Sequence, residues 1–126
     1  MNDLFLKVAA ATPDIRVADP DYNTEHIIEC MQKANTEHAK LLVLPELCLT
    51  GYTCGDLFLQ KALLDGAISG LNRIRKVSAN MDMMTIVGLP FSYMNRLYNV
   101  AAVVFHGEVI CLSLIHISEP TRLQLI

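Results

Sequence analysis

A single carboxylate interrupts an apolar run near the middle of the chain. In "LLVLPELCLT", residues 41–50, Glu46 follows four aliphatic residues and Pro45. A charge among such neighbours is costly unless it is paired or used. Apolar surroundings raise the base strength of a carboxylate because burial disfavours its charged form. Glu46 could therefore act as a general base, and the alternative is a structural glutamate bonded to backbone or to an arginine.

A thiol is one nucleophile that such a base can activate, since its ordinary pKa of about 8.5 keeps most of it protonated at neutral pH. The spacing of the cysteines contains no CxxC pair, which argues against a zinc site and a disulfide scaffold. We expect most of them to be small buried hydrophobes. The four are Cys30, Cys48, Cys54 and Cys111.

Thiols near Glu46 in the sequence make weak candidates for its partner. Cys48 would share a face with Glu46 if the strand continued past Pro45, but we interpret Cys48 as a packing residue. Cys54 falls in a loop with two glycines and has no obvious base beside it. A Cys–His dyad would need contacts that the sequence does not reveal. The histidines are His26, His38, His106 and His116.

The segments on either side of Glu46 predict a strand, a loop and a helix. "LLVL" is short and continuously apolar, which is typical of a strand covered on both faces. Pro45 weakens pairing, so Glu46 falls at a C-terminal strand end, where α/β proteins bind ligands. The loop 50–56 leads into a predicted helix 57–80. Its apolar stripe comprises Leu59, Leu63, Ala67, Leu71 and Ile74, widened by Leu64 and Ile68.

The rest of the chain extends this pattern into an α/β fold. A strand is predicted over 4–11, and a helix capped by Asn23 or Thr24 is predicted to run to about Lys40. The residues on its apolar side, at helical spacing, are Ile27, Met31, Ala34 and His38. Three further strands are predicted over 83–93, 99–106 and 108–114, with "MNRLYN" as a turn and Asn99 bonded to nearby backbone. The order strand–helix–strand–helix–strand–strand–strand predicts an α/β fold that ends in a hairpin.

Composition excludes several functions. The net charge is −3 and basic residues are dispersed, which argues against a nucleic-acid surface. No apolar run is long enough to span a bilayer, and the N-terminus lacks the pattern of a secretory signal, so we expect a cytoplasmic protein. No glycine-rich phosphate loop follows either early strand, which disfavours a flavodoxin-like module.

The segment "LPELCLTGYTCGDLF" resembles the first catalytic block of the nitrilase, or carbon–nitrogen hydrolase, superfamily. The resemblance is closest to the N-terminal glutaminase domain of bacterial glutamine-dependent NAD synthetases. The segments "VAAATPDIRVADPDYN", "IVGLPF" and "LYNVAAVVFHGEVI" extend it over residues 5 to about 111. It implies a partial αββα sandwich, the N-terminal half, with helices on one face of a mixed sheet.

The resemblance also implies a Glu–Lys–Cys triad in which Glu46 matches the general base. Tyr52 could line the substrate pocket or pack at the base of its loop, and Asp56 is interpreted as a helix cap. The parent would hydrolyse glutamine and use the ammonia to convert deamido-NAD to NAD. No cofactor is expected in this segment. ATP and Mg²⁺ would bind an absent synthetase domain, and the parent is expected to be a homo-oligomer.

The end of the chain departs from the family. No lysine follows Lys76 and no cysteine follows Cys111, so two members of the triad are missing. We expect residues 1–112 to be the N-terminal part of a hydrolase domain, and residues 113–126 to be a non-native tail resembling translated adaptor or vector sequence. The fragment itself is expected to be inactive. Alternatives are a fragment of a stand-alone nitrilase-type amidase and a non-catalytic partial α/β domain.

Overall fold

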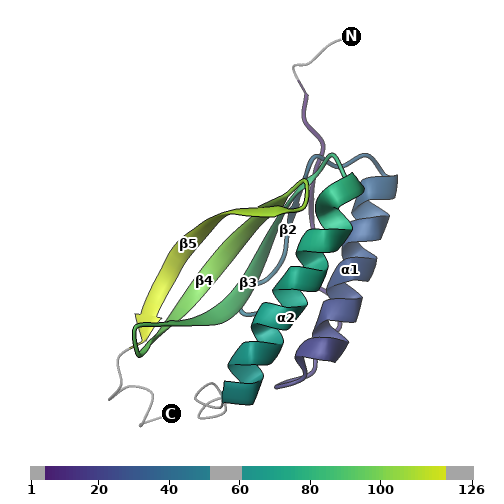
Figure 1. Ribbon diagram of the computed structural model, residues 1–126. Coiled ribbons are helices and arrows are strands. Elements are labelled where there is room, and N and C mark those ends of the chain that lie inside the picture. The colour runs from purple at the N-terminus through teal and green to yellow at the C-terminus, as the bar shows by residue number, and fades with distance from the viewer. Residues whose placement is uncertain (1–4, 52–60, 119–126) are drawn as a thin grey trace.

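A five-stranded mixed sheet carries two helices in the computed structural model, which describes residues 5–51 and 61–118 (Figure 1). The strands lie in the order β1-β2-β3-β4-β5. The elements are β1 (Val8–Ala10), α1 (Pro20–Thr36), β2 (Leu41–Val43), α2 (Lys61–Val77), the 3-10 helix η2 (Ser78–Asn80), β3 (Met84–Tyr93), β4 (Arg96–Phe105) and β5 (Glu108–Ser118).

The first three strands are parallel and the last three form antiparallel pairs. Each parallel connection contains a helix, and each new strand is added on the same side of the previous one. Because such crossovers are right-handed, both helices fall on one face of the sheet. Figure 1 shows α1 and α2 side by side on that face. The predicted α/β order, with its closing hairpins and its helices on one face, is confirmed.

Alternation along β3 and β4 divides their side chains between the two faces. Val87 and Leu89 are fully buried in the core together with residues of α2 such as Ala67. Neighbours on the strand must point the other way, so Gly88 and Pro90 lie on the face opposite the helices. Their cross-strand partners share that face, namely Ala101 for Gly88 and Asn99 for Pro90. We call this second face the open face.

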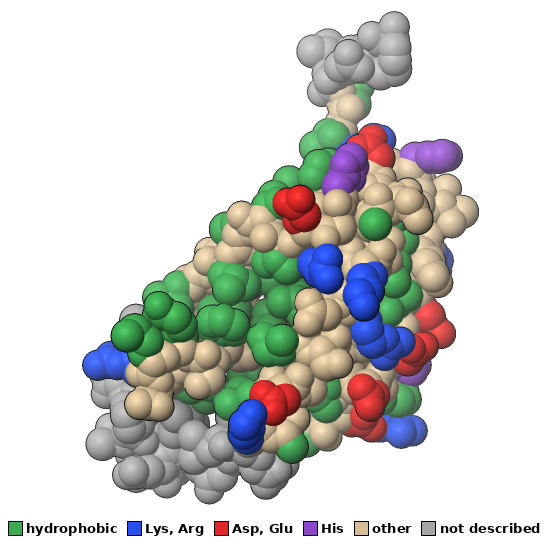
Figure 2. All heavy atoms as spheres, viewed as in Figure 1, with side chains coloured by type: hydrophobic (Ala, Val, Ile, Leu, Met, Phe, Trp, Pro, Cys, Tyr) green, Lys and Arg blue, Asp and Glu red, His purple; other side chains and the backbone are tan. Residues whose placement is uncertain are grey.

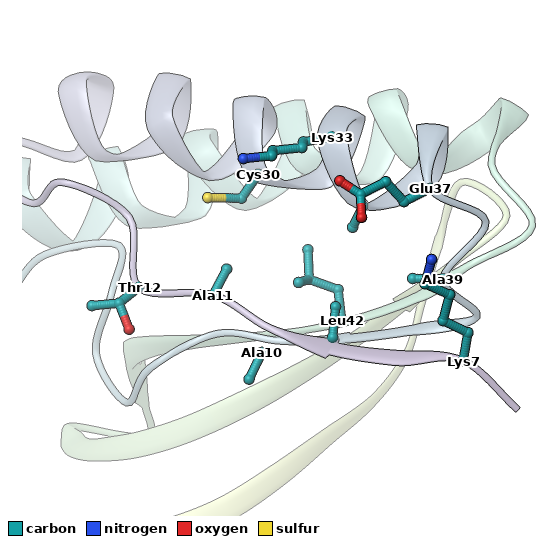
Figure 3. Close-up of a pocket in the computed structure, with 11 residues that line it drawn as sticks. Lys7, Ala10, Ala11, Thr12, Cys30, Lys33, Glu37, Ala39 and Leu42 are labelled. Atoms are coloured by element: carbon teal, nitrogen blue, oxygen red, sulfur yellow. The ribbon is translucent and has the colours of Figure 1, made fainter.

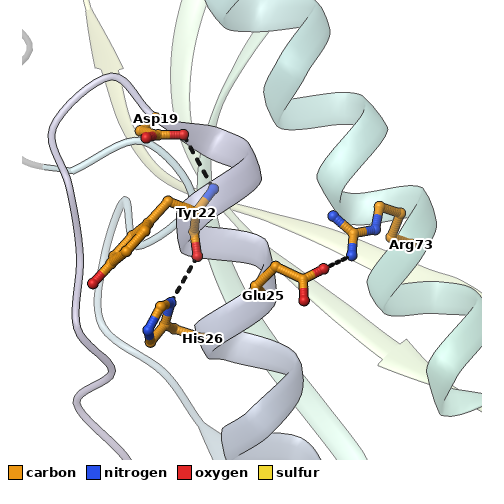
Figure 4. Close-up of polar contacts among 5 residues, drawn as sticks. All are labelled: Asp19, Tyr22, Glu25, His26 and Arg73. Carbon is orange, nitrogen blue, oxygen red and sulfur yellow. Dashed lines mark hydrogen bonds and ion pairs between the residues drawn. The ribbon is translucent and has the colours of Figure 1, made fainter.

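Helix α1 begins earlier and ends earlier than the sequence suggested. Asp19 is its N-cap, since its side chain accepts a hydrogen bond of 3.1 Å from the Tyr22 backbone N–H (Figure 4). Pro20 then occupies the first turn, where its missing N–H costs nothing. The predicted caps Asn23 and Thr24 were wrong, because both are buried inside the helix. His38 has a positive φ of 65°, so the helix stops before it and the predicted end at Lys40 was also wrong.

Helix α2 packs closely on α1 through its two glycines. The predicted stripe of Leu63, Ala67, Leu71 and Ile74 is buried as expected, while Leu59 lies outside the described residues. A Cβ at Gly66 would stand 3.1 Å from the Pro20 ring, and one at Gly70 would overlap the Thr24 hydroxyl. Larger residues would push the helices apart. An exposed ion pair between Glu25 and Arg73 also joins the two helices (Figure 4).

The hairpins differ from prediction in their bounds. The turn between β3 and β4 contains Met94 and Asn95, both at positive φ, rather than the six residues proposed. β5 continues to Ser118 and passes the predicted end at residue 114. Figure 2 shows hydrophobic side chains gathered over the β5 side of the sheet beside α2. No helix in the described ranges is long and apolar enough to cross a membrane. The exposed apolar residues of β5 include Ile110, Leu112, Leu114 and Ile115.

Candidate active site

Glu46 lies just beyond the C-terminal end of β2, as the sequence predicted. β2 ends at Val43, and a turn occupies residues 46–50. Glu46 is partly buried, whereas its neighbours in the turn, Leu47 and Cys48, are buried. The carboxyl ends of the parallel strands β1 to β3 face the same edge of the sheet, where α/β folds place their ligands. The strand end therefore positions Glu46 at an edge suited to chemistry.

The turn that carries Glu46 is fixed to the adjacent strand β3. The backbone N–H of Leu44 donates to the carbonyl of Ile86 at 3.0 Å, and that of Leu49 donates to the carbonyl of Gly88 at 3.2 Å. Within the turn, the Gly51 N–H donates to the Leu47 carbonyl at 2.7 Å. Leu47 itself has a φ of 54°, a left-handed conformation that is costly for a leucine. Because these bonds enforce the turn, the backbone of Glu46 is held in one place.

Asn99 of β4 binds the side chain of Glu46 directly. Its Nδ2 donates a hydrogen bond to the Glu46 Oε2 across 53 positions of sequence. Asn99 is 9% exposed and sits in the middle of β4, opposite Pro90 of β3. The expectation that Asn99 bonds nearby backbone was wrong. Strand pairing brings it to the Glu46 turn, and no short-range pattern in the sequence marks that contact.

A second asparagine supports the turn from behind. Asn23 of α1 is fully buried, and its Nδ2 donates to the carbonyls of Arg16, at 2.8 Å, and Leu49, at 3.0 Å. Its Oδ1 accepts from the Arg16 N–H at 2.7 Å. The Ala18 N–H also donates to the Thr50 carbonyl at 2.8 Å. The β1–α1 connection and the Glu46 turn therefore form one hydrogen-bonded unit.

Cys48 is a packing residue, as the sequence suggested. Its side chain is 2% exposed, and its Sγ lies 3.7 Å from the Gly88 carbonyl oxygen, to which the thiol donates. Burial raises the pKa of the Cys48 thiol to about 12. Because the thiolate is the nucleophile, Cys48 is unreactive at neutral pH. Its nearness to Glu46 in sequence does not produce a catalytic pair.

The other cysteines lie away from Glu46 or outside the described residues. Cys30 of α1 is half-buried and faces a cavity of about 270 Å³ between α1 and the strands β1 and β2 (Figure 3). Burial and the nearby charge of Glu29 raise the pKa of the Cys30 thiol, against the opposing effect of Lys33. Cys111 is exposed on β5, so the expectation of burial was wrong for it. The predicted site residues Tyr52, Cys54 and Asp56 lie outside the described residues.

Two histidines, His26 and His106, make contacts with residues other than Glu46. His26 stacks on Tyr22, and its Nδ1 lies 2.9 Å from the Tyr22 carbonyl oxygen, so the proton on Nδ1 is used there (Figure 4). His106 lies 3.6 Å from Asp82. Among residues 5–51 and 61–118, no group of three His, Cys, Asp or Glu side chains is placed to hold a metal ion.

The model of the carbon–nitrogen hydrolase family matches residues 7–123. The chain belongs to the carbon–nitrogen hydrolase family.

Relatives with similar sequences include two glutamine-dependent NAD(+) synthetases. The chain is 34% identical over 106 residues to the glutamine-dependent NAD(+) synthetase of Mycobacterium bovis, covering 84% of this chain. It is 36% identical over 106 residues to that of Xylella fastidiosa, covering 83% of this chain. It spans 16% of the length of the first relative and 19% of the second.

Solved structures confirm the fold. A glutamine-dependent NAD(+) synthetase from Cytophaga hutchinsonii superposes with a TM-score of 0.81 at 29% identity, covering 86% of this chain and 18% of that one. An amidase from Nesterenkonia sp. superposes with a TM-score of 0.75 at 24% identity, covering 93% of this chain and 45% of that one. The second likeness shows the fold alone.

Proposed function

We propose that Glu46 is the general base of a glutaminase centre in a glutamine-dependent NAD synthetase. The observation that carries the proposal is the fixed position of its partly buried carboxylate at the end of β2, in a chain that matches such synthetases. A base at this position is useful because it can remove the proton of a thiol as the sulfur attacks.

The reaction proposed for the whole protein is hydrolysis of the glutamine side-chain amide. A cysteine outside this chain adds its sulfur to the amide carbon while Glu46 accepts the thiol proton. A lysine, also outside this chain, stabilises the charged tetrahedral intermediate. Collapse breaks the C–N bond, the proton passes to the leaving nitrogen, and ammonia departs from a thioester. Water then cleaves the thioester to glutamate and regenerates the thiol.

The open face is the side from which these missing groups would approach. Asn99, which binds Glu46, lies on that face, and so does a row of apolar residues that includes Val43 at 40% exposure. In the αββα sandwich that the resemblance implies, a second sheet would cover this face. The carboxylate would then sit at the edge of the buried layer between two sheets, where water is largely excluded.

The remaining parts of the reaction lie beyond this segment. The ammonia would convert deamido-NAD to NAD at a synthetase domain that binds ATP and Mg²⁺, and the segment described here would contribute no cofactor site. Residues 1–112 would be the N-terminal part of the hydrolase domain in a cytoplasmic, homo-oligomeric parent. Residues 113–126 are proposed as a non-native tail, which a DNA sequence read across codons 110–120 in the source genome tests directly.

The activity test uses the full-length protein that contains this segment. Formation of NAD from deamido-NAD and ATP is measured with glutamine and, separately, with ammonia as the nitrogen source. The proposal predicts synthesis with both. Hydrolysis of simple amides without any synthesis of NAD would instead identify a stand-alone nitrilase-type amidase. Absence of a lysine and a cysteine in the hundred residues that follow Leu112 in the genome would contradict both activities.

A further inference from the structure

We propose that Asn99 is a positioning residue for the general base, holding the Glu46 carboxylate through its side-chain amide. This inference rests on the proposed function. It begins from the contact itself, in which Asn99 Nδ2 donates to Glu46 Oε2. Two oxygens facing each other would repel, so the amide must present its nitrogen to the carboxylate. The Asn99 amide therefore lies with its nitrogen toward Glu46.

Comparison of the two buried asparagines separates a structural role from a positioning role. Asn23 uses both ends of its amide on backbone groups, and it ties two connections together. Asn99 donates to a side chain, and its Oδ1 is buried without a hydrogen-bond partner in the described part of the chain. The donor of Asn99 is therefore directed at a carboxylate, whereas the amide of Asn23 binds backbone groups.

Asn99 and Glu46 also differ in the backbone that carries them. Asn99 lies mid-strand on β4, paired with Pro90 of β3 on one side and with His116 of β5 on the other. Glu46 lies on a turn after its strand has ended. A long carboxylate side chain on a turn samples several rotamers unless something fixes its end. The strand residue Asn99 therefore fixes the end of the longer Glu46 side chain.

An amide is also chemically suited to this task. It donates a hydrogen bond to an ionised carboxylate and carries no charge. An arginine or lysine in its place would form an ion pair that favours the ionised carboxylate strongly and so weakens it as a base. Asn99 can therefore fix the direction of Glu46 while leaving it able to accept a proton.

The test uses three variants of the full-length protein, assayed with glutamine and with ammonia. Asn99→Leu keeps the size of the side chain but removes the amide, and we expect the kcat for glutamine hydrolysis to fall by about 10–100-fold with little change in KM. Asn99→Asp places a second carboxylate against Glu46, which shifts the acidic limb of the glutaminase pH profile to higher pH. Asn80→Asp makes the same change at an exposed position of η2. It should leave the kcat for glutamine hydrolysis and the pH profile unchanged.

Synthesis of NAD from ammonia serves as the folding control, because it does not need Glu46. An unchanged kcat in Asn99→Leu, or an unchanged pH profile in Asn99→Asp, overturns the inference. If Asn99→Leu loses synthesis from ammonia as well, the isosteric Asn99→Asp variant decides through its pH profile. A wild-type protein that hydrolyses no glutamine refutes the proposed function and this inference with it. An active wild type with unaffected variants refutes the inference alone.

Discussion

The backbone of Gly88 on β3 lies directly against the backbone of Glu46. A Cβ at Gly88 would stand 3.0 Å from the Glu46 carbonyl carbon and 2.8 Å from the Pro45 carbonyl oxygen, and it would overlap the Leu47 nitrogen. Contacts this short with backbone atoms cannot be relieved by moving a flexible side chain. The turn that carries the carboxylate can therefore settle on the sheet only because residue 88 has no side chain.

Replacing Gly88 by alanine should displace this turn. We expect Gly88→Ala to destabilise the folded protein by about 1–3 kcal/mol through overpacking. It should also lower glutamine hydrolysis more than synthesis of NAD from ammonia, because the displaced group is Glu46. Thermal unfolding and the two activity assays measure these effects in the full-length protein. Ser92→Ala, at an exposed position of the same strand, is the control. A Gly88→Ala protein with wild-type melting temperature and glutaminase rate would refute the close packing of Gly88 against the Glu46 turn.

Removing the amide of Asn23 should loosen the same turn from the other side. Asn23→Ala leaves the buried Leu49 carbonyl without its donor, whereas the freed backbone groups of the exposed Arg16 can bind water. We therefore expect a loss of stability of about 2 kcal/mol. Chemical denaturation of the full-length protein checks this, with Gln32→Ala on the exposed side of α1 as the matched control. Equal stabilities of the two variants would show that the Asn23 bonds contribute nothing.

The Cys48 thiol should resist alkylation in the folded protein. Burial raises its pKa to about 12, so the reactive thiolate is scarce at pH 8, and 2% exposure blocks access. Treatment with iodoacetamide followed by peptide mass mapping should find Cys48 unmodified in the native full-length protein and modified after denaturation. Cys48→Ala should retain glutaminase activity. Rapid labelling of Cys48 in the native protein would contradict this prediction. So would loss of glutamine hydrolysis in Cys48→Ala with synthesis from ammonia intact, because Cys48 would then be a candidate nucleophile.

The 126-residue chain alone should release no ammonia from glutamine. Its sequence contains no lysine after Lys76 and no cysteine after Cys111, and its buried Cys48 is unsuited to attack. We also expect the isolated chain to associate, since apolar residues such as Val8, at 58% exposure, and Val43 lie uncovered. An enzymatic ammonia assay and analytical ultracentrifugation test both expectations. Ammonia release above that of a Glu46→Gln control would contradict the first, and a monodisperse, cooperatively melting monomer would contradict the second.

The placement of Glu46 was predictable because local signals agreed. An apolar run marked β2, and Pro45 marked its end, which set the carboxylate at the strand terminus. The stripe of α2 was equally clear, since helical periodicity is a local property. The start of α1 was missed although "DP" at Asp19 and Pro20 is a recognised cap signal. The apolar residues that repeat at helical spacing begin only at Ile27, so they point to a later start.

The contacts that complete the site could not be predicted in the same way. Asn99 reaches Glu46 because β4 pairs with β3 in one particular register, and register depends on the whole sheet. The need for glycine at position 88 arises from the same packing, since its φ is ordinary and only the neighbouring turn excludes a side chain. Cys111 was expected to be buried, but it is exposed on the edge strand β5. The sequence does not show which strand lies at the edge of the sheet.

As the proposed general base, Glu46 serves the hydrolysis of glutamine and has no part in the synthesis of NAD from ammonia. The most direct measurement compares Glu46→Gln with the wild-type full-length protein under both nitrogen sources. We predict that the glutamine-dependent rate falls by about 10²–10⁴-fold while the ammonia-dependent rate is unchanged. A glutamine-dependent rate equal to that of the wild type would show that Glu46 is not the general base.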